Sequence, residues 1–339
     1  MIDIKKDETI KNPFIHRLED YREQLNKRRE EGLIRGEHVG FSTFHDYYSV
    51  KKGSTTYIIA PPGSGKTYIT YEMILNLAEF HDYKVAIFSP EGGSPTDLFA
   101  EMLWSYLRVP FQKTKDMPNI PEATDEEVER GYKFMQEHFY IIDSGLREMN
   151  PVKYFEAIRD IEAEDGVKID ACVIDPVLEI NINPDNLRED IALNGFLTKI
   201  RKFSSENQIH TFIAIHTRAM GTVKGTLNTG EEIYYQPQPT FYDAAGGQTY
   251  SRKGYMIMSL WRPHAGLPKP DASGEYYVKN ELVVEVLKVK PKIMGKLGKV
   301  SLHFDYLSSR FFEDVDGERL HSRDITKESS KRDAIKIPI

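Results

Sequence analysis

A glycine- and proline-rich loop follows an apolar, β-branched run at residues 55–60 and ends in Gly-Lys-Thr. The order of strand, glycine loop and helix is typical of a site that binds a nucleoside triphosphate. Backbone N–H groups of the loop and the positive end of the helix dipole attract its phosphates. Lys66 is predicted to reach the β- and γ-phosphates, and the Thr67 hydroxyl to bind Mg²⁺. Ala60 replaces the first glycine of the usual pattern, which leaves this mechanism intact. The predicted phosphate-binding residues are Pro62, Gly63, Ser64, Gly65, Lys66 and Thr67.

Two other apolar runs end in a carboxylate. Glu91 follows the run 85–89, where it could polarise a water for attack on the γ-phosphate or be an ordinary solvated side chain. Asp175 follows the run 171–174 and fits a ligand that holds Mg²⁺ through water. Pro176 occupies the position where many ATPases have a catalytic glutamate. The sequence therefore assigns the general base to Glu91.

Cationic groups at two further strand ends could contact phosphates. His216 ends the run 211–216 and could sense the γ-phosphate, although a lone histidine at a strand end is also often structural. Lys288 and Lys290 alternate with apolar residues, so an extended chain would place them, with Lys292, on one side. Like charges on one face repel unless an anion compensates them, and a neighbouring subunit's γ-phosphate is one such anion. A solvated edge strand protected by lysine is the alternative.

The composition bounds the class of protein. The 339 residues are 40% hydrophobic, enough to bury a large core, and carry a formal net charge of −7. This mild charge argues against a surface that binds DNA everywhere, but it allows a local basic channel. The single cysteine, Cys172, excludes a disulfide framework and any zinc site that needs several cysteines. No run approaches the ~20 apolar residues of a membrane span, and the charged N-terminus lacks a signal-type segment, so we expect no membrane partner. We expect a cytoplasmic protein, in the host cytoplasm if a phage encodes it.

Strand and helix patterns alternate from residue 55 to about residue 304, which predicts a twisted, mainly parallel α/β sheet with helices on both faces. Two helix starts are well marked, one by Thr124 in a capping box and one by Asn150 before a proline. Residues 219–245 have little periodicity and are predicted to form a long loop. The predicted strands are 56–60, 85–89, 139–143, 171–175, 211–216, 255–260, 282–288 and 299–304.

Composition and pattern divide the chain into three regions. Residues 1–50 form a charged extension with a linker helix, residues 51–313 the nucleotide-binding domain, and residues 314–339 a polar C-terminal tail. The linker helix packs either on its own domain or on a neighbouring subunit, and the sequence favours neither. Its apolar face consists of Phe14, Leu18, Tyr21 and Leu25.

In order and spacing, six blocks of the sequence resemble the RecA-like motor domain of DnaB-type hexameric replicative helicases, closest to the branch of phage primase-helicases and mitochondrial Twinkle. The resemblance runs from about residue 40 to about residue 313 and is far more specific than the phosphate loop alone. It implies a RecA-like P-loop NTPase fold. The blocks are Gly63-Ser-Gly-Lys-Thr67, Phe88-Ser-Pro-Glu91, Val173-Ile-Asp175, Ile213-Ala-Ile-His216-Thr-Arg218, Tyr242-Asp-Ala-Ala-Gly-Gly247 and Lys288-Val-Lys290.

This resemblance implies a role for each catalytic candidate. Glu91 would be the base that activates water, Asp175 the ligand of a metal-bound water, and His216 the γ-phosphate sensor. Lys288 and Lys290 would act in trans on the adjacent subunit's nucleotide. The family usually has arginine where Lys290 stands, and lysine lacks the bidentate fork of a guanidinium, so we expect a weaker or slower trans-acting element.

The same resemblance implies two binding regions. Arg262 and Phe304 would flank the nucleobase. Arg218 and Lys224 lie in the segment that would line a central pore and grip single-stranded DNA, and a second DNA-binding loop would fall around residues 186–190.

Only about 50 residues precede the motor core, too few for a primase domain, so we expect a separate primase or loader. We expect a homo-oligomeric ring, a hexamer, that hydrolyses ATP or another NTP with Mg²⁺, translocates on single-stranded DNA and unwinds duplex during replication. Two alternatives stay open. One is a RecA-like DNA-dependent ATPase that acts as a recombination or loading switch without unwinding, and the other is a nucleotide-binding assembly protein with little turnover.

Overall fold

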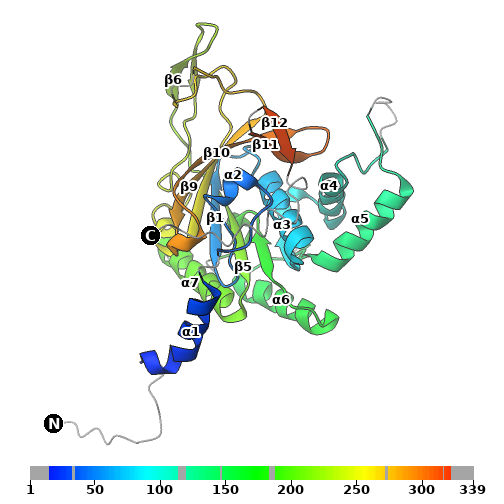
Figure 1. Cartoon of the computed structure of the whole chain (residues 1–339), viewed down its shortest axis with the longest axis vertical. Helices are drawn as coiled ribbons and strands as arrows, with labels where there is room; N and C mark the ends of the chain where they lie inside the picture. Colours follow the sequence, from blue (N-terminus) through cyan, green and yellow to red (C-terminus); the bar gives the residue numbers. More distant parts are fainter. Residues whose placement is uncertain are drawn as a thin grey trace, which may run out of the picture.

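The computed structural model describes residues 15–32, 35–113, 120–145, 147–182, 188–271, 274–315 and 317–321. Ten strands of this part of the chain form one sheet, in the order β12-β11-β10-β9-β8-β1-β5-β4-β2-β3 (Figure 1). All eight predicted strands are confirmed, with bounds that differ by at most two residues. The strands of the sheet are β1 (Thr55–Ala60), β2 (Val85–Phe88), β3 (Phe139–Ile141), β4 (Ala171–Ile174), β5 (His210–His216), β8 (Met256–Trp261), β9 (Glu281–Val289), β10 (Gly298–Asp305), β11 (Arg310–Val315) and β12 (Glu318–His321).

The sheet is parallel on one side of β8 and antiparallel on the other. Strands β3, β2, β4, β5, β1 and β8 run parallel, because helices or long segments return the chain to the same edge. No α-helix of the described residues lies between β8 and β12, and β9 to β12 pair antiparallel. All six residues of β1 are buried, as expected of a central strand covered on both faces.

Helices cover both faces of the sheet, as predicted. One core lies under α3, α4 and α5, and a second lies under α6, α7 and α8. The capping box of Thr124 with Glu127 and the N-cap Asn150 are confirmed at α5 and α6. The helices are α1 (Arg22–Glu31), α2 (Ser42–His45), α3 (Lys66–His81), α4 (Pro95–Leu107), α5 (Asp125–His138), α6 (Pro151–Asp165), α7 (Glu189–Asn207) and α8 (Thr249–Lys253), with 3-10 turns η1 (Leu18–Tyr21), η2 (Pro90–Gly92), η3 (Val177–Glu179) and η4 (Lys292–Met294).

The segment predicted as one long loop contains a hairpin, so that prediction was wrong in part. Strands β6 (Val223–Thr226) and β7 (Glu232–Tyr235) pair antiparallel and project from the top of the molecule in Figure 1. The hairpin rests on a small third core around Leu267, Tyr277 and Val283. Five of its eight strand residues are exposed, and neither VKGT nor EIYY is a regular alternation of apolar and polar residues, so the sequence does not mark a half-buried strand here.

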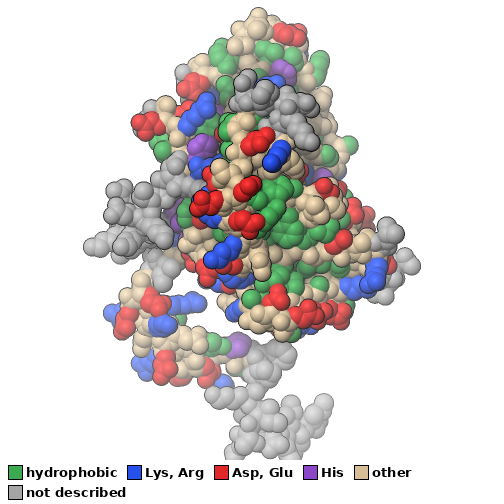
Figure 2. Space-filling view, turned by 90° about the vertical axis from the view of Figure 1, so that its right-hand side faces the viewer, with side chains coloured by type: hydrophobic (Ala, Val, Ile, Leu, Met, Phe, Trp, Pro, Cys, Tyr) green, Lys and Arg blue, Asp and Glu red, His purple; other side chains and the backbone are tan. Residues whose placement is uncertain are grey.

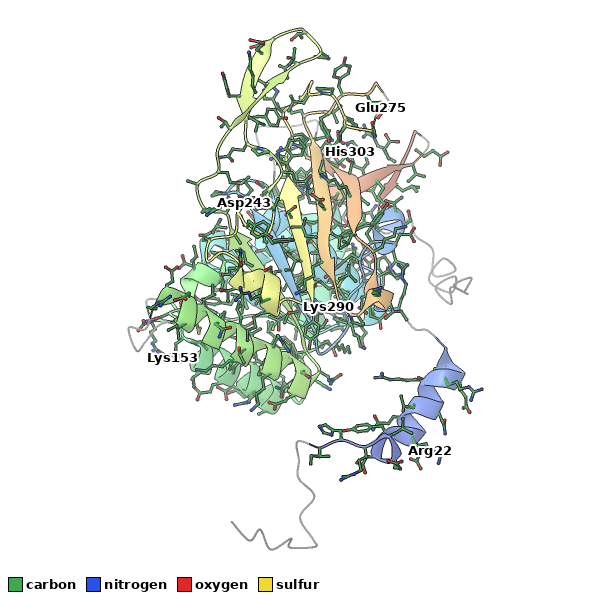
Figure 3. The ribbon with its side chains drawn as sticks, turned by 90° about the vertical axis from the view of Figure 1, so that its left-hand side faces the viewer. Arg22, Lys153, Asp243, Glu275, Lys290 and His303 are labelled. Carbon is green, nitrogen blue, oxygen red and sulfur yellow. The ribbon has the colours of Figure 1, made fainter. Side chains whose placement is uncertain are left out.

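The N-terminal helix stands apart from the body of the molecule (Figures 1 and 3). Every residue of α1 is exposed, and Leu18 and Leu25 expose 65% and 45% of their surface. The helix therefore does not pack on its own domain, one of the two alternatives that the sequence left open. Phe14, the fourth residue of its predicted apolar face, lies outside the described residues.

At the other end of the chain, β11 and β12 continue the sheet to His321, and residues 322–339 lie outside the described part. No described helix is both long and apolar enough to cross a membrane. The face over α4 and α5 carries acidic and basic side chains around an apolar patch, so no field of one sign covers it (Figure 2).

Candidate active site

The phosphate loop lies between the carboxyl end of β1 and the first turn of α3. Gly63 and Gly65 have φ values of +72° and +89°, a conformation that strains any residue with a side chain. A Cβ atom at either position would meet no atom within 4 Å, so backbone conformation, rather than crowding, requires glycine here. Helix α3 starts at Lys66 and has 16 residues, so its positive end points at the loop.

Lys66 is a buried cation beside this loop. Its Nζ atom donates hydrogen bonds to the carbonyl oxygens of Ala60 and Pro61, both at 3.1 Å, and to Nδ1 of His216 at 3.2 Å. Burial lowers the pKa of Lys66, because the ammonium is taken out of water. All three acceptors are neutral when His216 is unprotonated, so the residues present fit an anion at this position.

Thr67 and Asp175 meet on the other side of the loop. The Thr67 hydroxyl donates to Oδ2 of Asp175 at 2.7 Å. Burial raises the pKa of Asp175, and the Thr67 bond and the nearby Lys66 ammonium oppose that rise. A hydroxyl and a buried carboxylate side by side are the donor set that Mg²⁺ takes beside a phosphate, so the residues fit the predicted metal.

His216 connects Lys66 to Glu91. An ammonium can only donate, so Nδ1 of His216 must accept and Nε2 must carry the proton. Nε2 lies 3.3 Å from Oε2 of Glu91, the closer of the two carboxylate oxygens. The five catalytic and metal candidates of the phosphate site, Lys66, Thr67, Glu91, Asp175 and His216, therefore come together, because β1, β5, β4 and β2 are adjacent and their carboxyl ends share one edge.

Arg262 and Phe304, predicted to flank the nucleobase, line a cavity of 200 Å³ beside Ser64 and Gly65. Three aromatic residues that the sequence did not point to also line this cavity, namely Tyr68, Tyr306 and Phe311. The Tyr68 ring lies 5.3 Å from that of Phe304, and the Tyr306 hydroxyl accepts a hydrogen bond from Arg262 at 3.3 Å. Tyr68 directly follows Gly-Lys-Thr on the first turn of α3, a position that could have marked it as a neighbour of the nucleotide.

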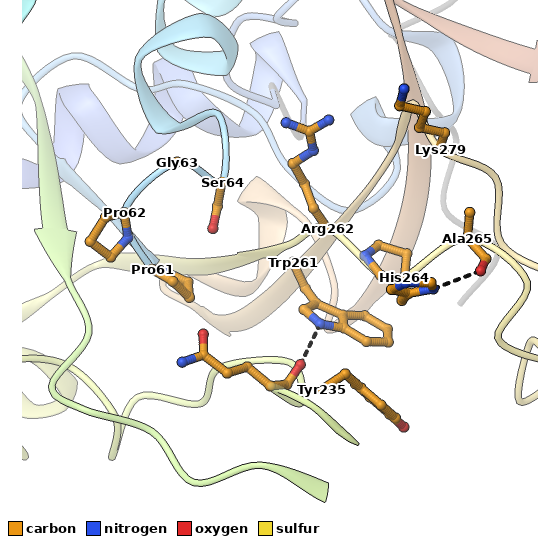
Figure 4. A pocket seen from close by; sticks show the side chains of 12 residues that line it. Pro61, Pro62, Gly63, Ser64, Tyr235, Trp261, Arg262, His264, Ala265 and Lys279 are labelled. Carbon is orange, nitrogen blue, oxygen red and sulfur yellow. Dashed lines mark hydrogen bonds between the residues drawn. The ribbon is translucent and has the colours of Figure 1, made fainter. Parts of the chain in front are cut away.

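A larger cavity of 690 Å³ opens on the first half of the phosphate loop (Figure 4). Trp261 forms one wall and is fixed by the hydrogen bond from its Nε1 to the carbonyl oxygen of Gln236, at 2.9 Å. Arg262 and Lys279 line the same cavity, and none of its lining residues is acidic. Arg262 lines both cavities, so a positive charge lies between them.

Lys288 and Lys290 lie far from the phosphate loop of their own chain. Val289 pairs with Met256, which pairs with Thr56 near the start of β1. Lys290 is therefore roughly 15 Å or more from the loop end of β1, measured along the strands, which is beyond the reach of a lysine side chain. Figure 3 shows it at the end of β9 away from the hairpin. The condition under which Lys292 would share a side with Lys288 and Lys290 is not met, because β9 ends at Val289 and Lys292 begins η4.

Arg218 and Lys224, the predicted DNA-binding residues, lie at and beyond the end of β5. Arg218 is exposed, and its backbone N–H donates to the carbonyl oxygen of Asp243 at 2.8 Å. Lys224 forms an ion pair of 2.8 Å with Glu232 across the hairpin. The second predicted DNA-binding loop, residues 186–190, falls in part outside the described residues, which resume at Arg188.

The chain and its fold were compared with known proteins and solved structures. No protein-family model matches the chain. The Twinkle homolog protein of Arabidopsis thaliana, chloroplastic and mitochondrial, is 23% identical over 283 residues, which cover 82% of this chain and 36% of that protein. The structure resembles the ATPase domain of G40P with a TM-score of 0.67 and 16% identity, over 88% of this chain and 99% of that one. It resembles a DnaB-like replicative helicase, solved in a study of its interactions with primase, with a TM-score of 0.62 and 16% identity, over 88% and 67% of the two chains.

The sheet order and the phosphate loop define a RecA-like P-loop NTPase fold. Within that class, the chain has the fold of the ATPase domain of DnaB-type replicative helicases, as the sequence resemblance predicted. It spans about a third of the length of the Twinkle homolog.

Proposed function

We propose that this chain is the motor of a DNA helicase that hydrolyses ATP or another NTP. One observation supports this most strongly, namely the contact chain from Lys66 through His216 to Glu91. It joins the residue that would hold the phosphates to the residue that would activate water. Among the similar proteins, the one described as a DnaB-like replicative helicase favours helicase activity over other uses of the same fold.

Each residue has a defined task in hydrolysis. The loop N–H groups and Lys66 would bind the β- and γ-phosphates and hold the γ-phosphorus in line with a water. A carboxylate oxygen of Glu91 would accept the proton of that water as it attacks. Thr67 and Asp175 would hold Mg²⁺, which when bound withdraws charge from the phosphate oxygens.

His216 would report the state of the phosphates to the DNA-binding segment. A γ-phosphate next to Lys66 would compete for the ammonium that now donates to Nδ1, and the imidazole would be free to donate to the phosphate instead. The backbone carbonyl of His216 accepts from Ala245 N–H at 2.9 Å, and Thr217 pairs with Ala244. A shift of His216 therefore moves residues 240–245, next to Arg218.

We further propose that the chain works as a homo-oligomeric ring, a hexamer. The geometry supports this in two places. Lys288 and Lys290 lie too far from their own phosphate loop to act on it, so they require the loop of another copy. Leu18 and Leu25 are exposed on a helix that stands apart from its own domain, as a helix that packs on a neighbour would be.

One observation favours the second candidate, a DNA-dependent ATPase switch that does not unwind. Lys224 is paired with Glu232, and Glu231 adds another negative charge to the hairpin. A hairpin with this charge attracts DNA phosphates weakly. In that case the hairpin would contact a protein partner, and Arg218 alone would contact DNA.

The deciding experiment is steady-state ATP hydrolysis by the wild type and Glu91→Gln, with and without single-stranded DNA at low salt. We expect DNA to stimulate the wild type, and Glu91→Gln to lose at least 100-fold in kcat while it still binds nucleotide. A duplex-unwinding assay then separates the motor from the switch. A hydrolysis rate that does not change with DNA would contradict the proposal of a DNA motor. A wild type that binds nucleotide but does not hydrolyse it would indicate an assembly role.

A further inference from the structure

Four cations gather on one face of the molecule, at the edge of the sheet opposite the phosphate loop. Lys288 donates a short hydrogen bond from Nζ to the carbonyl oxygen of Ser251, in α8. Lys253 of the same helix donates to the Thr198 hydroxyl of α7 at 2.8 Å. Arg201 lies one turn further along α7, with its guanidinium 5.3 Å from the centre of the Tyr255 ring. Lys290 completes the basic cluster, defined here as Arg201, Lys253, Lys288 and Lys290.

A bulge in β9 turns Lys288 toward this face. Val286 pairs with Met258 and packs in the core under α3, so regular alternation would place Lys288 on that side too. The pairing slips by one residue, and Lys288 instead faces Ile257, which belongs to the core under α7. The extra residue therefore moves Lys288 next to α7 and α8.

The cluster has no internal counter-charge. None of the ion pairs of the described residues involves Arg201, Lys253, Lys288 or Lys290. Burial, Lys290 and Arg201 together lower the pKa of Lys288, and no carboxylate opposes them. Cations held together in this way repel one another until an anion from outside binds.

We propose that Arg201 acts in trans with Lys288 and Lys290 and binds the triphosphate held in the phosphate loop of a second copy of this chain. The inference rests on the proposed function and adds a residue to it. Lysine offers a point charge, and the ammonium of Lys288 already donates to Ser251. Arg201 supplies the planar fork that binds two phosphate oxygens at once, from a helix rather than from β9.

Single-stranded DNA is the competing occupant of the basic cluster. Lys288 is partly buried beneath α8, which suits one compact phosphate group more than an extended strand. The exposed Arg218 lies at the other edge of the sheet, beyond the end of β5. Single-stranded DNA bound at Arg218 would have to extend along the whole length of the β-strands to reach Arg201.

The test compares Arg201→Gln with Lys199→Gln, an exposed position of the same helix with the same change of charge. We expect Arg201→Gln to lower kcat at least tenfold, with unchanged affinity for a fluorescent ATP analogue and unchanged oligomeric state by sedimentation. Arg201→Lys should recover part of the rate, and Lys199→Gln should match the wild type. Unfolding curves of all three variants show whether a lost rate reflects a lost fold.

A mixing experiment then tests action in trans. The Arg201→Gln subunit keeps an intact active site around its phosphate loop, and the Glu91→Gln subunit keeps an intact basic cluster. In rings formed from an equal mixture, about a quarter of the subunit interfaces therefore combine an intact active site with an intact basic cluster. We expect the mixture to hydrolyse faster than either variant alone.

Three results would overturn the inference while wild-type hydrolysis stands. They are an Arg201→Gln rate equal to that of Lys199→Gln, a lowered rate that mixing does not raise, and weaker DNA binding with DNA-independent hydrolysis unchanged. An inactive wild type would instead contradict the proposed function.

Discussion

Among single residues, Lys66 and Asp175 show how the site is prepared for its ligands at a cost to the fold. Both are nearly fully buried, and burial shifts both pKa values toward the neutral form. In the absence of ligands, each charged form destabilises the folded state. Bound triphosphate and Mg²⁺ would remove that penalty, and part of their binding energy would come from this source.

At the residue scale we predict that Asp175→Asn raises the melting temperature of the ligand-free protein. The pKa of Asp175 is higher in the folded state than in the unfolded chain, so its ionised form costs stability at pH 7, and this cost vanishes below the unfolded pKa. Asparagine removes the charge and can still accept from Thr67. Calorimetry at pH 7 measures the change, and hydrolysis with Mg²⁺ should fall to background.

The control for this prediction is Asp160→Asn, an exposed position on α6, which should leave both properties unchanged. A lower melting temperature for Asp175→Asn would show that its carboxylate stabilises the ligand-free fold.

At the scale of elements, the end of the sheet opposite the active site depends on a buried histidine. His210 begins β5, with Nδ1 at 2.9 Å from the carbonyl oxygen of Lys51 and Nε2 at 2.9 Å from the hydroxyl of Thr56. The Tyr48 hydroxyl lies 2.8 Å from the same Thr56 oxygen. The neutral ring therefore connects β1, β5 and the segment before β1.

We predict that stability falls as the pH drops below 6.5. Burial lowers the pKa of His210 to about 4, so the unfolded chain takes up a proton at a pH where the folded protein does not. The stability that the neutral His210 ring contributes is fully present above pH 6.5, and about 2 kcal/mol of this contribution is lost at pH 5. Urea unfolding at pH 7.5 and pH 5 measures this loss.

His210→Gln separates this histidine from the other titrating groups. The difference in free energy of unfolding between the wild type and His210→Gln should shrink by about 2 kcal/mol as the pH falls from 7.5 to 5. A constant difference between the two proteins would mean that another group carries the acid sensitivity.

At the scale of the whole molecule, a buried ion pair joins the beginning of the domain to its end. Arg310 of β11 donates from Nε and Nη2 to the two carboxylate oxygens of Glu72 on α3, both at 2.6 Å, and from Nη2 to Asn76 Oδ1 at 2.7 Å. Near the same edge, the Glu313 carboxylate accepts from the backbone N–H groups of Ser42 and Thr43 at the start of α2.

We predict that Glu72→Gln destabilises the domain by about 3–5 kcal/mol, because it leaves the buried guanidinium without its counter-charge. Urea unfolding measures the change. Lys133→Gln removes one half of the exposed pair Lys133–Glu137 and should change stability by less than about 1 kcal/mol. A similar small change for Glu72→Gln would mean that water reaches Arg310.

The exposed N-terminal helix leads to a prediction about assembly. Leu18 and Leu25 contact no core of their own domain, so replacing both by serine should leave the unfolding free energy within about 0.5 kcal/mol of the wild type. If they pack on a neighbour, the same variant should shift the sedimentation profile toward smaller species. Lys27→Ser on the same helix is the control. An unchanged profile would locate the oligomer contacts elsewhere.

The sequence alone predicted eight of the ten strands of the sheet, the phosphate loop and most of the phosphate site, but it did not predict β11 and β12. Apolar runs, glycine positions and strand-end residues such as Glu91 and Asp175 are local signals, and parallel strands bring their ends together by topology. The hairpin β6–β7 was missed because its stability comes from packing on Trp261 and Tyr277, to which its own pattern gives no clue. Tyr306 and Arg201 could be identified only from the tertiary structure, because distant segments bring them to their sites.

Tertiary structure also decided which face Lys288 occupies. The lysine spacing predicts one side of a strand, but the bulge that selects the side is a pairing slip between β8 and β9. Such a slip depends on how two strands fit against their cores, and no single segment encodes it. The sequence therefore predicted the local chemistry of the site, whereas the orientation of the groups proposed to act between copies depended on long-range packing.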